Sequence, residues 1–145
     1  MANKELVVRA ITEESMKDVE SLDEMSGNCV SQWLEDNEDY AWGLFKNNNL
    51  IGYCTIGYAD DCGPEIENYK GYTHDSLLLS DVFIKPEYRK QGYALLMIEE
   101  AIRLRTANQK ELIFLMVLYD DLRNLYEKCG FEYVKNGVMV RDERN

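Results

Sequence analysis

The feature of this sequence that most constrains its fold is a turn between an apolar run and an amphipathic helix. Residues 82–94 read Val-Phe-Ile-Lys-Pro-Glu-Tyr-Arg-Lys-Gln-Gly-Tyr-Ala, which is a strand end, a proline, a basic turn and a glycine. After Gly92, apolar residues recur at helical spacing as far as about Asn108. The sequence therefore predicts a strand, a turn and a helix whose first backbone N–H groups point back into the turn.

This turn is suited to binding a phosphate group. Unpaired N–H groups and the positive end of the helix dipole attract an anion. Small residues at Gly92 and Ala94 allow the anion to approach the backbone closely, and Arg89 and Lys90 add positive charge. The same pattern also fits an ordinary strand-to-helix turn with surface cations, so the turn alone leaves both interpretations open.

The other apolar runs predict a mixed α/β chain. The predicted strands are Leu6–Ile11, Tyr40–Lys46, Leu50–Tyr58, Leu77–Ile84, Glu111–Val117, Phe131–Lys135 and Val138–Arg141. The runs Leu77–Ile84 and Glu111–Val117 are the most continuously apolar, which is typical of central strands covered on both faces. Asn47-Asn48-Asn49 and Asn136-Gly137 predict hairpin turns, because these residues tolerate left-handed backbone conformations.

Two further helices are expected in the N-terminal half. Thr12 is a candidate N-cap for the first, and the second is predicted over Cys29–Asp36. Residues 59–75 are predicted to be a long connection. The length of 145 residues is typical of one domain, 1–145, with one substantial core.

Composition excludes several classes of protein. No apolar run approaches the ~18–20 residues of a membrane span, and the start lacks a secretion signal, which predicts a cytoplasmic location without a membrane partner. Four scattered cysteines and a single histidine, His74, predict no metal site. The net charge of −11 argues against nucleic acid as a partner. This charge either attracts a cationic small molecule or only keeps the protein soluble.

Two motifs make the chain similar to the GNAT superfamily of acetyl-CoA-dependent N-acetyltransferases. Arg89-x-x-Gly92-x-Ala94 matches the pyrophosphate loop of that family, Gln/Arg-x-x-Gly-x-Gly/Ala. Residues 125–131, Leu-Tyr-Glu-Lys-Cys-Gly-Phe, resemble the second signature, a helix that ends in Leu-Tyr-Glu-Lys-x-Gly-Phe. The resemblance covers residues 76–135 well, and it covers the N-terminal half by the order of its elements.

The resemblance implies a fold and a cosubstrate. The fold is α/β (α+β), with a mixed, mostly antiparallel sheet of six to seven strands and about four helices on both faces. Strands 77–84 and 111–117 would splay apart, and the pantetheine arm of acetyl-CoA would lie in the gap. The residues that the resemblance assigns to the coenzyme are Val82, Phe83, Ile84, Arg89, Lys90, Gln91, Gly92, Tyr93, Ala94 and Tyr119. Of these, Val82 and Ile84 would act through their backbone groups. Tyr119 stands where many relatives have an asparagine that contacts CoA.

Tyr126 is the residue that matches the general acid of the family. It would stabilise the departing thiolate of CoA, by a strong hydrogen bond or by proton donation concerted with C–S cleavage. An alternative is that Tyr126 only belongs to the core, because Leu122, Leu125, Tyr126 and Cys129 form a stripe at helical spacing.

The proton acceptor remains open among three residues. Asp81 is the only carboxylate within Leu77–Ile84, and it is either the general base or a hydrogen-bonded structural group. Ser80 stands where some relatives carry a glutamate or a histidine; it is too weakly basic to act directly, but it can hold a water. His74, in the loop before the strand, is a further candidate.

The resemblance predicts an N-acetyltransferase that acts by direct attack of a primary amine in a ternary complex. Acidic residues near 35–39 and within 59–75 favour a small cationic acceptor, polyamine-like or aminoglycoside-like, although a solvated acidic face fits them too. One alternative is a protein N-terminal or lysine acetyltransferase. Another is a non-catalytic CoA-binding regulatory module. Homodimers are common among similar enzymes.

Overall fold

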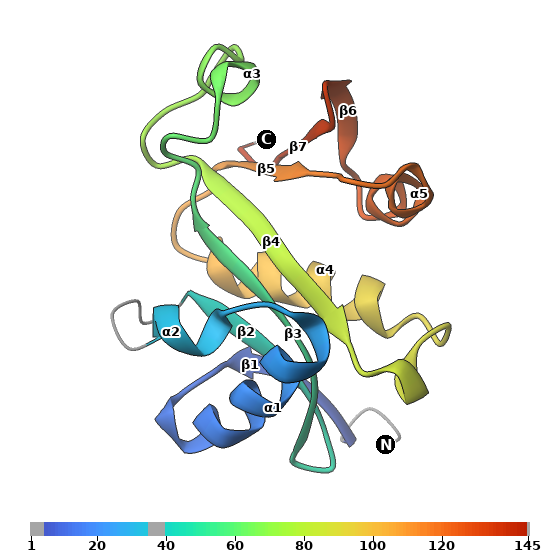
Figure 1. Ribbon diagram of the computed structural model, residues 1–145. Helices are drawn as coiled ribbons and strands as arrows, with labels where there is room; N and C mark the ends of the chain where they lie inside the picture. Colours follow the sequence, from blue (N-terminus) through green and yellow to red (C-terminus); the bar gives the residue numbers. More distant parts are fainter. Residues whose placement is uncertain (1–4, 35–39, 145) are drawn as a thin grey trace. The chain divides into compact units, whose positions relative to one another are not determined.

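The computed structural model describes residues 5–34 and 40–144 and has a mixed α/β fold (Figure 1). Seven strands follow the hydrogen-bonded order β1-β2-β3-β4-β5-β7-β6. They are β1 (Leu6–Ala10), β2 (Ala41–Lys46), β3 (Asn49–Tyr58), β4 (Leu77–Ile84), β5 (Leu112–Met116), β6 (Glu132–Lys135) and β7 (Val138–Asp142). The β1–β2, β2–β3, β5–β7 and β6–β7 pairs are antiparallel, whereas β4 and β5 pair in parallel. The predicted mostly antiparallel sheet is confirmed.

The helices are α1 (Met16–Ser26), α2 (Val30–Leu34), α3 (Pro64–Glu67), α4 (Tyr93–Arg105) and α5 (Asp120–Lys128). The short 3-10 helices Glu13–Ser15 and Pro86–Tyr88 add single turns. The chain divides into two compact units, Met1–Thr55 with Asp81–Arg105, and Ile56–Ser80 with Thr106–Asn145. That residues 1–145 form one domain stays a prediction.

The core of the first unit forms where α1 and α2 cover one face of its strands. Its buried residues are Ile11, Val19, Leu22, Val30, Ala41, Phe45, Leu50 and Tyr53. Helix α4 packs against β1 and β2 and buries its own apolar stripe, Met97, Ile98, Ala101 and Ile102. The helix that the apolar spacing predicted after Gly92 is therefore confirmed, although it ends at Arg105 rather than near Asn108.

A carboxylate on α1 holds α2 in place. Asp23 accepts hydrogen bonds from the backbone N–H groups of Val30 at 3.2 Å and Ser31 at 3.0 Å, and from the Ser31 hydroxyl at 2.7 Å. The buried hydroxyl of Tyr53, on β3, donates to the same carboxylate at 2.6 Å. Because a helix of five residues has little stability of its own, these bonds fix α2 to α1 and to the sheet.

The second unit has a core of its own. Its buried residues are Ala59, Ile66, Leu112, Phe114, Val138 and Val140. The rings of Tyr69 and Tyr72 pack against Phe114, with centroids 5.5 and 6.4 Å away. The 59–75 segment, predicted as a connection, contains α3, which begins at Pro64 after Gly63. Proline is favoured at the first position of a helix because its fixed φ suits the helix and its missing N–H is not needed there.

Both predicted hairpin turns are present. Asn47 and Asn48 have φ values of 51° and 69°, and Asn136 and Gly137 have 51° and 83°. At residue 137 only glycine fits, because a Cβ there would lie 2.9 Å from the carbonyl oxygen of Val117. The Gly137 carbonyl in turn accepts a hydrogen bond from the Val117 N–H at 2.7 Å.

Two helix boundaries differ from those predicted. Thr12 precedes the 3-10 helix rather than α1, and its side chain makes no capping hydrogen bond. The second helix begins at Val30 instead of Cys29 and is described as far as Leu34. Residues 35 and 36 of that prediction lie outside the described residues.

Replacing Asp23 with alanine should destabilise the first unit. The buried Tyr53 hydroxyl and the first N–H groups of α2 would lose their acceptor, which we expect to lower the free energy of unfolding by about 2–3 kcal/mol. Urea denaturation followed by circular dichroism measures the difference. Glu24→Ala is the matched control, because Glu24 is an exposed neighbour on the same helix. Equal effects of the two substitutions would contradict the role given to Asp23.

Candidate functional site

The turn that precedes α4 exposes the start of that helix. Lys90 and Gly92 have left-handed φ values of 64° and 80°. The carbonyl of Gly92 accepts a hydrogen bond from the Leu96 N–H at 3.1 Å, so helical bonding begins there. Within residues 5–34 and 40–144, the backbone N–H groups of residues 92–95 have no hydrogen-bond acceptor. The structure thus has the free donors that the sequence predicted at this helix start.

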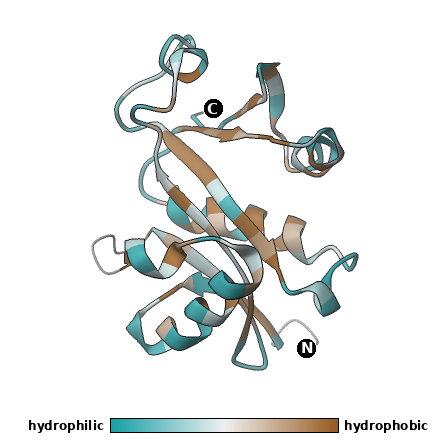
Figure 2. Cartoon of the chain, in the orientation of Figure 1, coloured by the Kyte–Doolittle hydropathy of each residue, from teal (hydrophilic) through white to brown (hydrophobic). Residues whose placement is uncertain are grey.

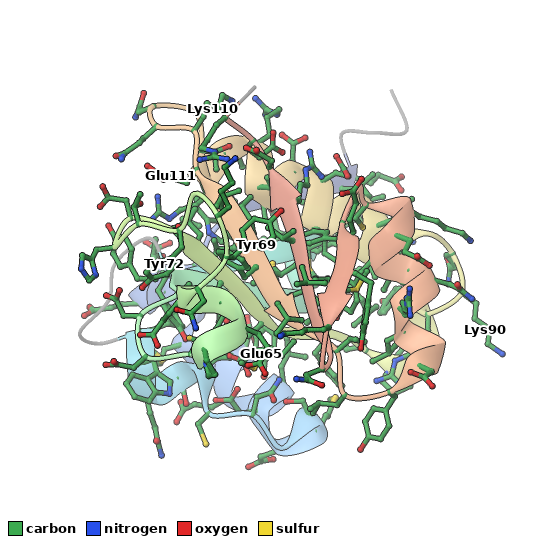
Figure 3. All side chains as sticks on the ribbon, turned by 90° about the horizontal axis from the view of Figure 1, so that it is seen from above. Glu65, Tyr69, Tyr72, Lys90, Lys110 and Glu111 are labelled. Atoms are coloured by element: carbon green, nitrogen blue, oxygen red, sulfur yellow. The ribbon has the colours of Figure 1, made fainter. Side chains whose placement is uncertain are left out.

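The space in front of this helix start is open. A Cβ placed on Gly92 would meet no atom within 4 Å. Lys90 is exposed, and Figure 3 shows its side chain pointing away from the protein at the edge of the molecule. Four N–H donors, the helix dipole and an adjacent cation form an arrangement that binds a phosphate or a diphosphate.

Arg89 ties the turn to the end of β4. Its Nε donates a hydrogen bond to the carbonyl of Ile84 at 2.8 Å, and its guanidinium lies 5.1 Å from the ring centroid of Phe83. The Ile84 carbonyl therefore already uses one of its two lone pairs within the protein. The charge of Arg89 stays exposed beside the turn.

Lys46, at the end of β2, is a contact of the turn that the sequence analysis missed. Its ammonium group donates a hydrogen bond to the Tyr93 hydroxyl at 3.3 Å and lies 5.5 Å from the ring centroid of Tyr88. The rings of Tyr88 and Tyr93 stack with centroids 6.4 Å apart. Lys46 and Tyr93 are 47 residues apart in sequence, so no local pattern reveals this contact.

The pairing of β4 with β5 is short. Leu77 and Leu78 pair with Ile113 and Phe114, and beyond them no further pair of these strands is present in the described residues. The two strands are longer than this paired stretch, since β4 has 8 residues and β5 has 5. The splaying of these two strands stays a prediction.

Asp81 interrupts the alternation of β4. Its φ is 54°, a left-handed value that is uncommon for a residue other than glycine. Buried and half-buried residues alternate from Leu77 to Ser80, and the pattern breaks at Asp81. In Figure 2 β4 is hydrophobic at both ends with a hydrophilic break between them. Such a local irregularity changes the direction in which a side chain points.

The Asp81 carboxylate is held by Thr55 of β3. The Thr55 hydroxyl donates to Oδ2 of Asp81 at 3.0 Å, and Thr55 is completely buried. Burial, together with the charge of Asp81, raises the pKa of the neighbouring Cys54 thiol to about 12. Thr55 was not predicted as a site residue from the sequence, although a lone threonine in the apolar run Leu50–Tyr58 was a visible signal.

Tyr126 lies near the end of α5 and is 9% exposed. Its ring packs edge-on against Phe131, and its carbonyl accepts hydrogen bonds from the N–H groups of Cys129 at 3.0 Å and Phe131 at 3.1 Å. Arg141 donates to the carbonyl of Cys129 at 2.7 Å. Leu122 is 40% exposed, so the stripe that suggested a purely structural role is buried only toward the end of the helix.

The remaining candidates lie in the second unit. Ser80 is half-buried. The His74 side chain is 94% exposed and lies 3.4 Å from a carboxylate oxygen of Asp60. Tyr119 is 67% exposed and precedes α5 with an extended backbone.

The acidic residues of the 59–75 segment lie near α3. Asp60 accepts a hydrogen bond from the hydroxyl of Tyr72 at 3.1 Å. Glu65 accepts one from Asn136 at 2.8 Å, and this bond lowers the pKa of Glu65. Figure 3 shows Glu65 and Tyr72 on this segment. The acidic residues between 35 and 39 lie outside the described residues.

The described residues contain neither a cluster of metal ligands nor a membrane-spanning helix. No group of three or more His, Cys, Asp or Glu side chains there is arranged to hold a metal ion. None of the helices in that part of the chain is long and apolar enough to cross a membrane.

Comparison with known proteins links this arrangement to a family. The model of the Acetyltransferase (GNAT) family matches residues 7–131, which is most of the chain. No curated protein matches the sequence.

Solved structures share the fold at low sequence identity. NAA60 of Arabidopsis thaliana in complex with acetyl-CoA is 15% identical with a TM-score of 0.70, over 97% of this chain and 99% of that one. A GNAT-family acetyltransferase of Streptococcus agalactiae is 16% identical with a TM-score of 0.66, over 97% and 96%. YhbS of Escherichia coli in complex with CoA is 14% identical with a TM-score of 0.68, over 95% and 81%.

Proposed function

This chain belongs to the GNAT family of acetyltransferases, and on that premise we propose that it transfers the acetyl group of acetyl-CoA to a primary amine of a small cationic molecule. The observation that carries the proposal is the open start of α4, where residues 92–95 present free N–H groups beside Lys90. Acetyl-CoA or CoA is bound in structures of similar fold.

In this proposal the diphosphate of the coenzyme lies against the start of α4. The N–H groups of residues 92–95 donate to its oxygens, and the helix dipole and Lys90 offset its charge. Arg89 and Gln91 complete the turn, with Tyr93 and Ala94 opening the helix. The backbone groups of Val82 and Ile84 are assigned to the pantetheine arm, with Phe83 as a wall, and Tyr119 to a further contact with CoA.

The reaction needs a neutral amine. An alkylamine with a pKa of about 10.4 requires about 4.6 kcal/mol to lose its proton at pH 7. We assign proton acceptance to Asp81, whose φ of 54° breaks β4 and whose carboxylate is held by Thr55. The first proton is lost to solvent before attack; the neutral amine then attacks the thioester carbonyl, its nitrogen becomes positively charged as the C–N bond forms, and Asp81 accepts the second proton from it. Ser80 is assigned to holding a water.

The departing thiolate needs a hydrogen-bond donor. We assign this role to Tyr126, which lies in a sequence similar to the family signature and is held by the packing of Phe131 at the end of α5. Because a phenol and a thiol have reference pKa values of about 10 and 8.5, a strong hydrogen bond or a concerted transfer is favoured over a free phenolate.

The proposed acceptor is cationic because the protein is strongly acidic. A net charge of −11 attracts a cation at long range. The described part of the 59–75 segment carries Asp60, Asp61, Glu65, Glu67 and Asp75. Binding energy from such ion pairs aligns the amine with the thioester, and alignment supplies much of the acceleration.

A pair of glycine substitutions tests the coenzyme site. Gly92 and Gly27 both have a φ of 80°, and a Cβ on either would meet nothing within 4 Å. Gly92→Ala and Gly27→Ala should therefore destabilise the fold similarly, by about 1–2 kcal/mol. Only Gly92→Ala should weaken CoA binding, by roughly 10- to 100-fold, because its methyl group occupies the position of the diphosphate. Calorimetric titration with CoA measures the effect, and equal affinities in both variants would contradict the site.

A panel of acceptors tests the substrate class. Thiol release from acetyl-CoA should be accelerated by polyamines or aminoglycosides, and less by neutral amino acids and peptides. Higher salt should raise KM for the cationic acceptors because it screens their attraction. Acceleration by peptides alone would instead identify a protein acetyltransferase. If CoA binds but no acceptor of the panel accelerates thiol release, the protein would be a non-catalytic CoA-binding module.

Substituting Tyr126 tests the proposed acid. Tyr126→Phe should lower kcat by about 10²-fold, because the thiolate loses its donor, while the Kd for CoA changes little. Tyr133→Phe is the control, since Tyr133 is an exposed tyrosine of β6 in the same unit. Unchanged turnover in Tyr126→Phe would remove this residue from the mechanism.

A further inference from the structure

A completely buried threonine in a strand needs a physical reason. Thr55 lies in a β3 segment where residues 50–56 are all buried. A hydroxyl that is removed from water destabilises the fold unless it is hydrogen-bonded, and valine would fill the same space without that penalty. In Thr55 the penalty is offset by the bond to Oδ2 of Asp81 at 3.0 Å.

The direction of this bond is fixed by chemistry. An ionised carboxylate only accepts hydrogen bonds, so the single hydroxyl hydrogen of Thr55 points to Asp81. Thr55 and Asp81 therefore form an ordered pair in which the hydroxyl donates and the carboxylate accepts.

The hydrogen-bonded Thr55 and Asp81 side chains lie on the face of the first unit that α1 and α2 cover. Thr55 pairs with Ala41, which belongs to the core under these helices, and it follows Tyr53 by two residues on β3. Tyr40 and Phe83 pack against the same core. In a regular strand, side chains alternate between the two faces. The left-handed φ of Asp81 interrupts this alternation and brings its carboxylate to Thr55.

We propose that Thr55 is a positioning residue that orients the Asp81 carboxylate for proton transfer. Thr55 occupies Oδ2, and Oδ1 has no hydrogen-bond donor in the described part of the chain. Oδ1 is thus the oxygen that accepts the proton from the acceptor nitrogen as the C–N bond forms. This inference rests on the proposed function, because it assigns a geometry to the base of that reaction.

The test compares two variants of Thr55. Thr55→Val removes the hydroxyl at nearly constant volume, and it should lower kcat roughly 10- to 100-fold with little change in the KM for acetyl-CoA. Thr55→Ser restores the hydroxyl and should recover most of the rate.

A double-mutant cycle separates positioning from a general loss of stability. If Thr55 acts through Asp81, Thr55→Val should add nothing to the loss of kcat in Asp81→Asn. Additive losses would overturn the proposal, and so would a Thr55→Ser variant as slow as Thr55→Val. Absence of transfer by the unmodified protein would instead contradict the proposed function, so the two failures are distinguishable. Thermal unfolding of each variant confirms that it is folded at the assay temperature.

Discussion

The account depends on backbone N–H groups that the fold leaves without acceptors at the start of α4. A helix cannot satisfy its first donors by itself, and most helices bond them to a capping side chain or to water. Here Gly92 opens the helix with a left-handed φ, and a side chain there would meet no other atom. Arg89 and Lys46 hold the flanking residues rather than the donors themselves. The donors are therefore oriented and available to a ligand, which is what recognition of a diphosphate requires.

The second constraint is the irregularity of β4 at Asp81. A regular strand would place Asp81 on the same face as Leu77 and Leu79, which are buried. A left-handed residue other than glycine is strained by about 1–3 kcal/mol, and such strain persists where the surroundings fix it. The bond from Thr55 is one interaction that fixes it. Strain of this kind is concentrated at functional sites, which agrees with the role given to Asp81.

Local chemistry explains which features the sequence predicts and which it does not. Glycine before an amphipathic run predicted the start of α4, and Asn136-Gly137 predicted the hairpin between β6 and β7. In both cases the backbone conformation is encoded by adjacent residues. Helix α3 was missed because four residues are too few to show a helical period. The turn at Asp81 was missed because aspartate does not by itself specify a left-handed φ. The contacts of Thr55 with Asp81 and of Lys46 with Tyr93 join residues that are distant in sequence.

If the start of α4 binds the diphosphate of a coenzyme, its backbone N–H groups must respond when CoA is added, and backbone NMR observes each of them. During titration of the ¹⁵N-labelled protein with CoA, the account predicts large, saturable shifts of the amide signals of residues 92–95, reproduced in part by inorganic pyrophosphate. Signals of the Gly27 turn, which has the same backbone conformation, should stay in place. Saturable binding of CoA that leaves residues 92–95 unshifted, or no binding at all, would contradict the account.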